Sequence, residues 1–151
     1  MKKVVLFILA VCTFTATFSQ AKKNLNLISH TTFNVELNDV WGYVDGNGVE
    51  YALVGRKDGV SIFSLDDPAN PVEVADIPGQ NSVWRDLKTY GTYAYVSHDR
   101  YRTSPGDGTL IIDLSDLPNS VTYKDTVMEG INFAHNLYID DGVLYSIGND
   151  S

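Results

Sequence analysis

Apolar and β-branched residues occur along this chain in short runs that alternate with turn-forming residues. The turn signals include Asp45-Gly46-Asn47-Gly48, Tyr90-Gly91-Thr92 and Asp140-Asp141-Gly142. After the first twenty or so residues, no stretch keeps a helical hydrophobic period for three turns. Short apolar runs bounded by glycine, aspartate and asparagine are typical of β-hairpins. The pattern therefore predicts an all-β protein.

The same group of predicted strands is repeated along the chain. Ala52 and Ala94 are 42 residues apart, and Pro68 and Pro118 are 50 apart. A period in the forties is typical of four-stranded propeller blades and is too long for leucine-rich or ankyrin repeats. The matching segments are EYALVG (50–55), TYAYVS (92–97) and VLYSIG (143–148), together with GVSIFSLDDPANPVEV (59–74) and GTLIIDLSDLPNSVTY (108–123).

The repeats predict about two and a half blades of an incomplete β-propeller. A lead-in segment (22–36) precedes blade one (about 37–79) and blade two (about 82–128), and blade three begins near 132. We expect strands near 39–44, 50–55, 59–64 and 71–77 in blade one, and near 84–90, 92–97, 108–114 and 121–127 in blade two. Because a propeller needs several blades to close, we expect the chain to be the first part of a longer protein, cut at Ser151 within blade three.

Residues 1–21 have the pattern of a secretory signal peptide. Lys2 and Lys3 precede an uncharged, largely apolar run from Val4 to Phe18. The segment 19–21 then offers small residues at the −3 and −1 positions of a cleavage site. The apolar run is short for a membrane span and is followed by the polar KKNLN. We therefore expect a secreted protein with no membrane insertion of the mature chain.

Cys12 is the one cysteine of the chain, and it lies inside the predicted signal peptide. A lipoprotein is disfavoured because Val11 stands where a lipobox requires Gly, Ala or Ser. The mature chain would have no disulfide, no thiol nucleophile and no cysteine metal site. Export without disulfides fits a bacterial surface or periplasmic protein.

The mature chain is strongly acidic. Removal of residues 1–21 leaves nine basic residues against nineteen acidic ones, a formal net charge of −10. Such a surface repels nucleic acid and anionic lipid, so neither is expected as a partner. The charge suits a soluble exported domain, or one that attracts cations.

The repeats resemble the start of the choice-of-anchor B domain, which is built of LVIVD-type repeats and found in secreted bacterial proteins. The resembling segments are LNDVWGYVDGNGVEYALVGRKDGVSIFSLDDPANPVEVADIPG (37–79), VWRDLKTYGTYAYVSHD (83–99), GTLIIDLSDLP (108–118) and AHNLYIDDGVLYSIGND (134–150). The TFSQA ending of the signal also resembles exported proteins of Bacteroidetes-type bacteria. The resemblance implies a β-propeller displayed on the cell surface through a C-terminal anchoring segment, which is absent here. It implies no particular reaction.

A polar pair opens each predicted inner strand: Asn38-Asp39, Arg85-Asp86 and His135-Asn136. One interpretation is a ring of oxygen ligands at a channel mouth, with Asp39 and Asp86 suited to Ca²⁺. The other is that each side chain bonds to the backbone of its own turn, as Asp and Asn often do. Repetition favours the second interpretation, because structural devices repeat with the unit.

Histidine and aromatic residues supply the remaining candidates. His135 suits a metal ligand or general base, although no second histidine lies at a ligand spacing, which favours a structural role. Trp41 and Trp84 are expected in the core, and Tyr101 in the loop 98–107 is the better contact candidate. Segment 45–50 is expected to form a hairpin turn and not a calcium loop.

These residues favour a non-enzymatic module that binds an extracellular protein, glycan or other ligand. The alternative is a propeller-type metal-assisted hydrolase whose active site needs blades absent from this chain. No cofactor is expected except possible calcium. The candidate ligand-binding residues are Asp39, Arg85, Asp86, Tyr101, His135 and Asn136.

Export is the first testable prediction. Expressed in a suitable bacterial host, the protein should leave the cytoplasm with a new N-terminus near residues 20–22, because a signal peptidase cleaves after small residues. Cell fractionation with N-terminal sequencing measures this. Intact Met1 in the membrane fraction would contradict it, and lipid on Cys12 would support the lipoprotein alternative.

Overall fold

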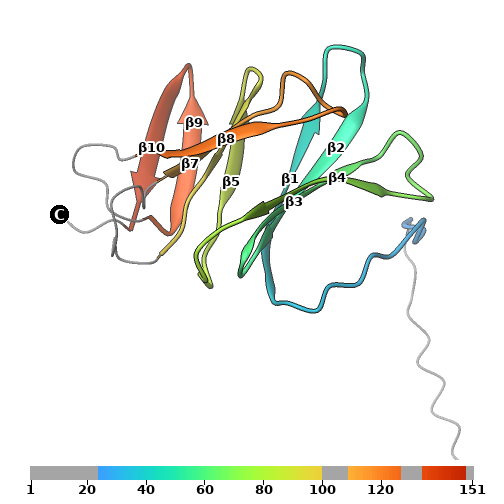
Figure 1. Ribbon diagram of the computed structural model, residues 1–151, viewed down its shortest axis with the longest axis horizontal. Coiled ribbons are helices and arrows are strands. Elements are labelled where there is room, and N and C mark those ends of the chain that lie inside the picture. Colours follow the sequence, from blue (N-terminus) through green and yellow to red (C-terminus); the bar gives the residue numbers. More distant parts are fainter. Residues whose placement is uncertain (1–23, 100–108, 127–133, 149–151) are drawn as a thin grey trace, which may run out of the picture.

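The computed structural model describes residues 24–99, 109–126 and 134–148. Within these ranges the chain forms ten strands and no helix, which confirms the all-β prediction (Figure 1). The predicted signal peptide and Tyr101 lie outside the described residues. The strands are β1 (Leu37–Val44), β2 (Glu50–Arg56), β3 (Gly59–Ser64), β4 (Val72–Pro78), β5 (Leu87–Tyr90), β6 (Tyr93–Val96), β7 (Thr109–Asp113), β8 (Thr122–Thr126), β9 (Asn136–Asp140) and β10 (Val143–Ile147).

The strands form three antiparallel sheets, each made of consecutive strands. The first sheet has the order β1-β2-β3-β4, the second β5-β6-β7-β8, and the third consists of β9 and β10. The predicted strands agree with these bounds, except that 84–90 was expected and β5 begins at Leu87. Among the described residues, no helix is long and apolar enough to cross a membrane.

The turn after β1 is a hairpin turn, as predicted. The Asp45 carboxylate accepts hydrogen bonds from the backbone N–H groups of Asn47 and Val49, at 2.8 and 2.9 Å. Gly48 has a φ of 86°, a conformation that glycine adopts without the steric cost of a Cβ. The carboxylate is thus used by its own turn.

The first and second sheets pack face to face. Residues opposite each other in a ladder share a face, so each sheet has two faces with different residues. We call the face that points toward the next sheet in the chain the front face, and the opposite one the back face. The front face of the first sheet includes Tyr51 and Leu53, which are buried against Leu87, Ala94 and Val96 on the back face of the second. The buried core shared by these two sheets comprises Tyr51, Leu53, Val60, Ile62, Ile77, Leu87, Ala94, Val96, Leu110, Ile112, Leu114 and Leu117.

The third sheet lies beside the second. Its back face carries Leu137, which is buried, and its turn residue Gly142 lies against the ring of Tyr90 on the front face of the second sheet. The first strands of successive sheets are neighbours, β1 beside β5 and β5 beside β9. Figure 1 shows the three sheets side by side in chain order.

The structure corrects the alignment of the third repeat. The sequence match places Tyr145 at the position of Ala94, but the ladders pair Tyr145 with Tyr138 and Tyr95 with Lys88. Both hairpins have two-residue turns, so positions counted from the turn make Tyr145 equivalent to Tyr95. A shift of one residue moves every side chain to the other face. Tyr145 therefore lies on the front face.

Gly55 permits the close packing of the first two sheets, which gives a second prediction. A Cβ on Gly55 would lie 2.7 Å from the carbonyl oxygen of Arg85 and 3.0 Å from Leu87, so Gly55→Ala must push the sheets apart. We expect a loss of about 1–3 kcal/mol in the free energy of unfolding, the usual cost of overpacking. Urea denaturation followed by circular dichroism measures it.

The matched control is Gly42→Ala in β1, where an added Cβ meets no atom within 4 Å. It should change the free energy of unfolding by no more than about 0.5 kcal/mol. Equal effects of the two substitutions would show that the sheets do not approach each other as described.

Candidate functional site

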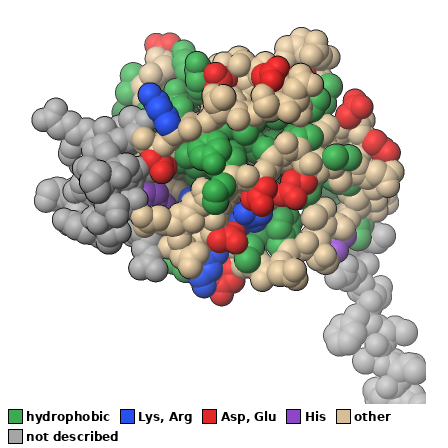
Figure 2. Space-filling view, in the orientation of Figure 1, with side chains coloured by type: hydrophobic (Ala, Val, Ile, Leu, Met, Phe, Trp, Pro, Cys, Tyr) green, Lys and Arg blue, Asp and Glu red, His purple; other side chains and the backbone are tan. Residues whose placement is uncertain are grey.

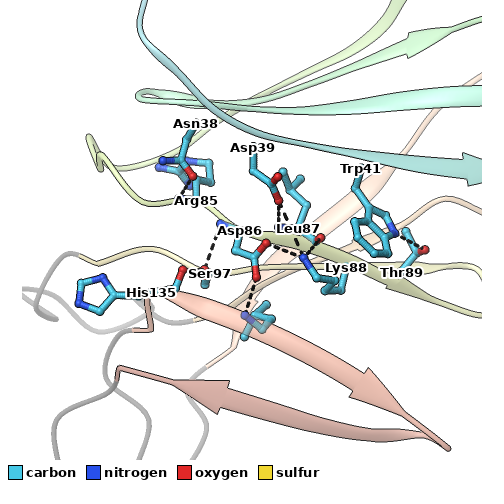
Figure 3. Close-up of polar contacts among 11 residues, drawn as sticks. Asn38, Asp39, Trp41, Arg85, Asp86, Leu87, Lys88, Thr89, Ser97 and His135 are labelled. Atoms are coloured by element: carbon cyan, nitrogen blue, oxygen red, sulfur yellow. Dashed lines mark hydrogen bonds and ion pairs between the residues drawn. The ribbon is translucent and has the colours of Figure 1, made fainter.

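The aspartates of the first two polar pairs join successive sheets through backbone amides (Figure 3). Asp39 lies near the start of β1, and its Oδ2 accepts the N–H of Leu87 at 3.0 Å. Asp86 directly precedes β5, and its Oδ2 accepts the N–H of Leu137 at 2.6 Å. Each carboxylate therefore binds the first-strand amide of the next sheet. We call this repeated hydrogen bond the carboxylate clasp.

The clasp changes both interpretations of the polar pairs. The two carboxylates bond to backbone, as the structural interpretation expected, but the amides of Leu87 and Leu137 belong to the next sheet and not to the aspartates' own turns. Bonded residues are 48 and 51 positions apart, close to the repeat length. The aspartate recurs in the first two repeats because it is the acceptor at both described junctions between sheets.

Asn38 and Arg85 reinforce the first junction. The Asn38 side chain accepts the N–H of Arg85 at 2.8 Å and donates to the carbonyl of Val83. The Arg85 guanidinium is only 2 % exposed and donates to the carbonyls of Arg56 (2.8 Å) and Gln80. Burial lowers the pKa of Arg85. Arg85 thus binds backbone inside the protein and offers a ligand almost no surface.

Lys88 completes the site and was not foreseen from the sequence. Its Nζ lies 2.5 Å from Oδ1 of Asp86 and 3.9 Å from Oδ2 of Asp39. The same ammonium stands 4.3 Å from the ring centre of Trp41, a cation–π contact. Trp41 is held in turn by a 3.0 Å hydrogen bond from Nε1 to Oγ1 of Thr89. The one sequence signal was a lysine within a predicted inner strand.

The two carboxyl groups lie within hydrogen-bonding reach of each other and titrate together. Burial raises the pKa of Asp39, and the neighbouring Asp86 carboxyl raises it further. Burial also opposes ionisation of Asp86, but hydrogen bonds from Asp39, the Leu137 amide and Lys88 outweigh it and lower the pKa of Asp86. Asp86 is therefore the carboxylate that holds its charge, and Asp39 is the one that a proton or an amide would replace at little cost.

A calcium ion would meet a cation already in place. Lys88 lies beside both carboxylates, and the two oxygens of Asp86 bond to Lys88 and to Leu137. Within the described ranges, no group of three or more His, Cys, Asp or Glu side chains could hold a metal ion. Calcium at Asp39 and Asp86 stays a prediction, and it would require Lys88 to be displaced.

The third polar pair lies on the far side of the second junction. The backbone N–H of His135 donates to the carbonyl of Ile147 at 3.0 Å, and its ring contacts Trp84 edge to face at 5.5 Å. Asn136 begins β9 and is exposed. Trp84 is 48 % exposed and Trp41 is also partly exposed, so the expectation that both tryptophans lie in the core was wrong.

The chain matches no protein-family model, no curated protein and no solved structure. The resemblance to the choice-of-anchor B domain therefore has no independent support from these comparisons.

Substitution of the two clasp aspartates gives a third prediction. The raised pKa of Asp39 means that its ionisation weakens folding as pH rises above 3.8, so Asp39→Asn, which keeps an oxygen acceptor, should leave the melting temperature at pH 7 unchanged or higher. The lowered pKa of Asp86 stabilises the fold above pH 3.8 and is lost as pH falls through its folded value. Asp86→Asn should therefore cost about 1–3 kcal/mol at pH 7, because Lys88 loses its ion pair.

Thermal melts at pH 7 and pH 3 measure both effects, and the cost of Asp86→Asn should shrink at the lower pH. Equal costs for the two variants at pH 7 would contradict the different roles of the two carboxylates. The same melts with calcium and with chelator test the metal hypothesis. If calcium raises the melting temperature of the wild-type protein but not that of Asp39→Asn/Asp86→Asn, a calcium site is established.

Proposed function

We propose that the sheets of this chain are consecutive blades of an exported β-propeller. Three observations support this architecture: four-stranded meandering sheets, first strands that adjoin one another, and a clasp that recurs at each junction. Front face packs on back face at the first junction, and at the second junction Gly142 of the third sheet lies against Tyr90 on the front face of the second. This is the packing expected of radially repeated blades.

The proposed function is to bind an extracellular glycan or protein at the end of the sheets where the first strands begin. The observation that carries it is the half-exposed indole of Trp84, supported from one side by the His135 ring. Trp84 lies outside the strands, in the segment that leads into β5. A partly exposed indole held at its edge is a suitable surface for a sugar ring or an apolar peptide side chain.

The proposed location of the protein outside the cell rests on the sequence and not on the structure. The signal-peptide pattern of residues 1–21 and the family resemblance support secretion and display at the bacterial surface. Figure 2 shows acidic side chains spread over the face in view, between exposed apolar and polar groups, as the acidic composition requires. A metal-assisted hydrolase gains no support from Asp39 and Asp86, because these carboxylates are occupied by amides and Lys88.

The fourth prediction tests the binding surface. Purified protein applied to an array of bacterial and host glycans, and to common extracellular matrix proteins, should bind a defined subset. Trp84→Ala should weaken that binding at least tenfold, as loss of a central aromatic contact usually does. Calorimetry with the best ligand measures the change.

The control is Tyr123→Ala, because Tyr123 is 49 % exposed but lies on β8, whereas Trp84 lies in the segment before β5. It should bind as wild type does, and both variants should melt within a few degrees of wild type. If no ligand bound on the array, or if both variants lost binding equally, the proposal would be contradicted. Hydrolysis of an array ligand would favour the enzyme alternative.

A further inference from the structure

A hollow of about 260 Å³ lies at the junction of the first two sheets. Three segments surround it: the residues that enter β1, the turn between β2 and β3, and the segment that leads into β5. The lining residues are Glu36, Leu37, Asn38, Lys57, Ser82 and Val83. Pockets for drug-sized ligands occupy roughly 300–1,000 Å³. The smaller volume here suits a single sugar ring.

Backbone hydrogen bonds fix the walls of the hollow. The N–H of Lys57 donates to the carbonyl of Glu36 at 2.9 Å, and the carbonyl of Lys57 accepts the N–H of Ser82 at 2.8 Å. The side-chain amide of Asn38 donates to the carbonyl of Val83 and so joins the first segment to the third. The hollow is therefore formed before a ligand arrives, which lowers the entropic cost of binding.

An accessible ion pair supplies the polar part of the lining. Nζ of Lys57 lies 2.9 Å from Oε2 of Glu36, and the two side chains are 41 % and 72 % exposed. An exposed pair of this kind contributes little to stability. The ammonium has three donors and the carboxylate several acceptor positions, so each can form bonds beyond the one that they share. The pair thus offers a donor and an acceptor side by side.

Leu37 and Val83 supply the apolar part, and both side chains are exposed. Trp84, whose half-exposed indole carries the proposed function, follows Val83 directly in the chain. Consecutive Cα atoms are about 3.8 Å apart. One oligosaccharide can therefore contact the hollow and the indole together.

A neutral sugar matches this combination of groups. Each ring hydroxyl is both a donor and an acceptor, so one hydroxyl can donate to Glu36 while its neighbour accepts from Lys57. The C–H groups of the ring pack on the apolar side chains and leave water. A sugar carboxylate would instead face the Glu36 carboxylate and the net negative charge of the chain. The charges therefore favour a neutral sugar over an acidic one.

We propose that this hollow binds one neutral sugar residue of an extracellular glycan, with Glu36 and Lys57 bonded to two adjacent ring hydroxyls. This inference rests on the binding function proposed above, and it selects the glycan from the two ligand classes named there. A protein ligand becomes an outcome of the test.

Calorimetry with defined sugars tests the inference. The probes are neutral oligosaccharides of glucose, mannose and galactose, and oligomers of the corresponding uronic acids. At least one neutral probe should bind, and its uronic acid counterpart should bind at least tenfold more weakly. Glu36→Gln and Lys57→Met should each weaken binding of the neutral probe about tenfold, the effect of one lost charge-assisted hydrogen bond. Glu36→Gln should also narrow the preference for the neutral probe, a change that a purely structural role of Glu36 would not produce.

Glu50→Gln and Lys124→Met are the matched controls, because they make the same charge changes elsewhere. Glu50 begins β2, whereas Lys57 follows the last residue of that strand, and Lys124 is exposed on β8. Both controls should bind the neutral probe as wild type does. All four variants should melt within a few degrees of wild type, since exposed ion pairs add little stability.

The outcomes separate this inference from the proposed function. If Trp84→Ala abolishes binding of a sugar that Glu36→Gln and Lys57→Met bind as wild type does, the hollow is not the subsite and the binding function stands. The same conclusion follows if uronic acids bind as tightly as neutral sugars, or if only a protein ligand binds. If neither a glycan nor a protein binds, the inference and the proposed function both fail.

Discussion

The hydrogen bond from a first-strand amide to the aspartate of the preceding sheet fixes how the sheets of this protein stand relative to one another. β5 and β9 are edge strands of their sheets, so their outward N–H groups have no partner within their own sheet. A buried amide without a partner is costly, and apolar packing alone has no direction. The Asp39–Leu87 and Asp86–Leu137 bonds remove that cost and select one spacing between neighbouring first strands. The large core between the sheets can then pack in one register.

The clasp brings a difficulty of its own, because it places two carboxylates close together. Lys88 neutralises one of them, and the Trp41 ring supports the ammonium from another side. The second charge is the one that burial disfavours, which is why the pKa of Asp39 is raised while that of Asp86 is lowered. The third repeat has Asn136 at the same position. At the two described junctions the acceptor is a carboxylate oxygen, and Lys88 accompanies the carboxylate that keeps its charge.

Local patterns predicted most of the fold and little of the site. Alternation and turn residues identify hairpins without reference to distant parts of the chain, so strands β1 to β4 were placed nearly to the residue. The third repeat was aligned one residue out of register because the alignment matched similar residue types. The register is set instead by the two-residue turn at Asp141 and Gly142. The partners of the aspartates lie about one repeat away, and the burial of Arg85 depends on carbonyls from two other segments. Neither is encoded in a local pattern.

The three polar pairs separate a structural position from a variable one. The second residue is Asp39, Asp86 or Asn136, always an acceptor, and in the first two it binds the next sheet. The first residue differs in chemistry and in environment: Asn38 bonds to backbone, Arg85 is buried, and His135 stands against the exposed Trp84. A position held by the junction is poorly placed to acquire ligand specificity, because loss of its oxygen acceptor costs stability. The first position carries three different side chains, and His135 is the one that stands against an exposed aromatic ring.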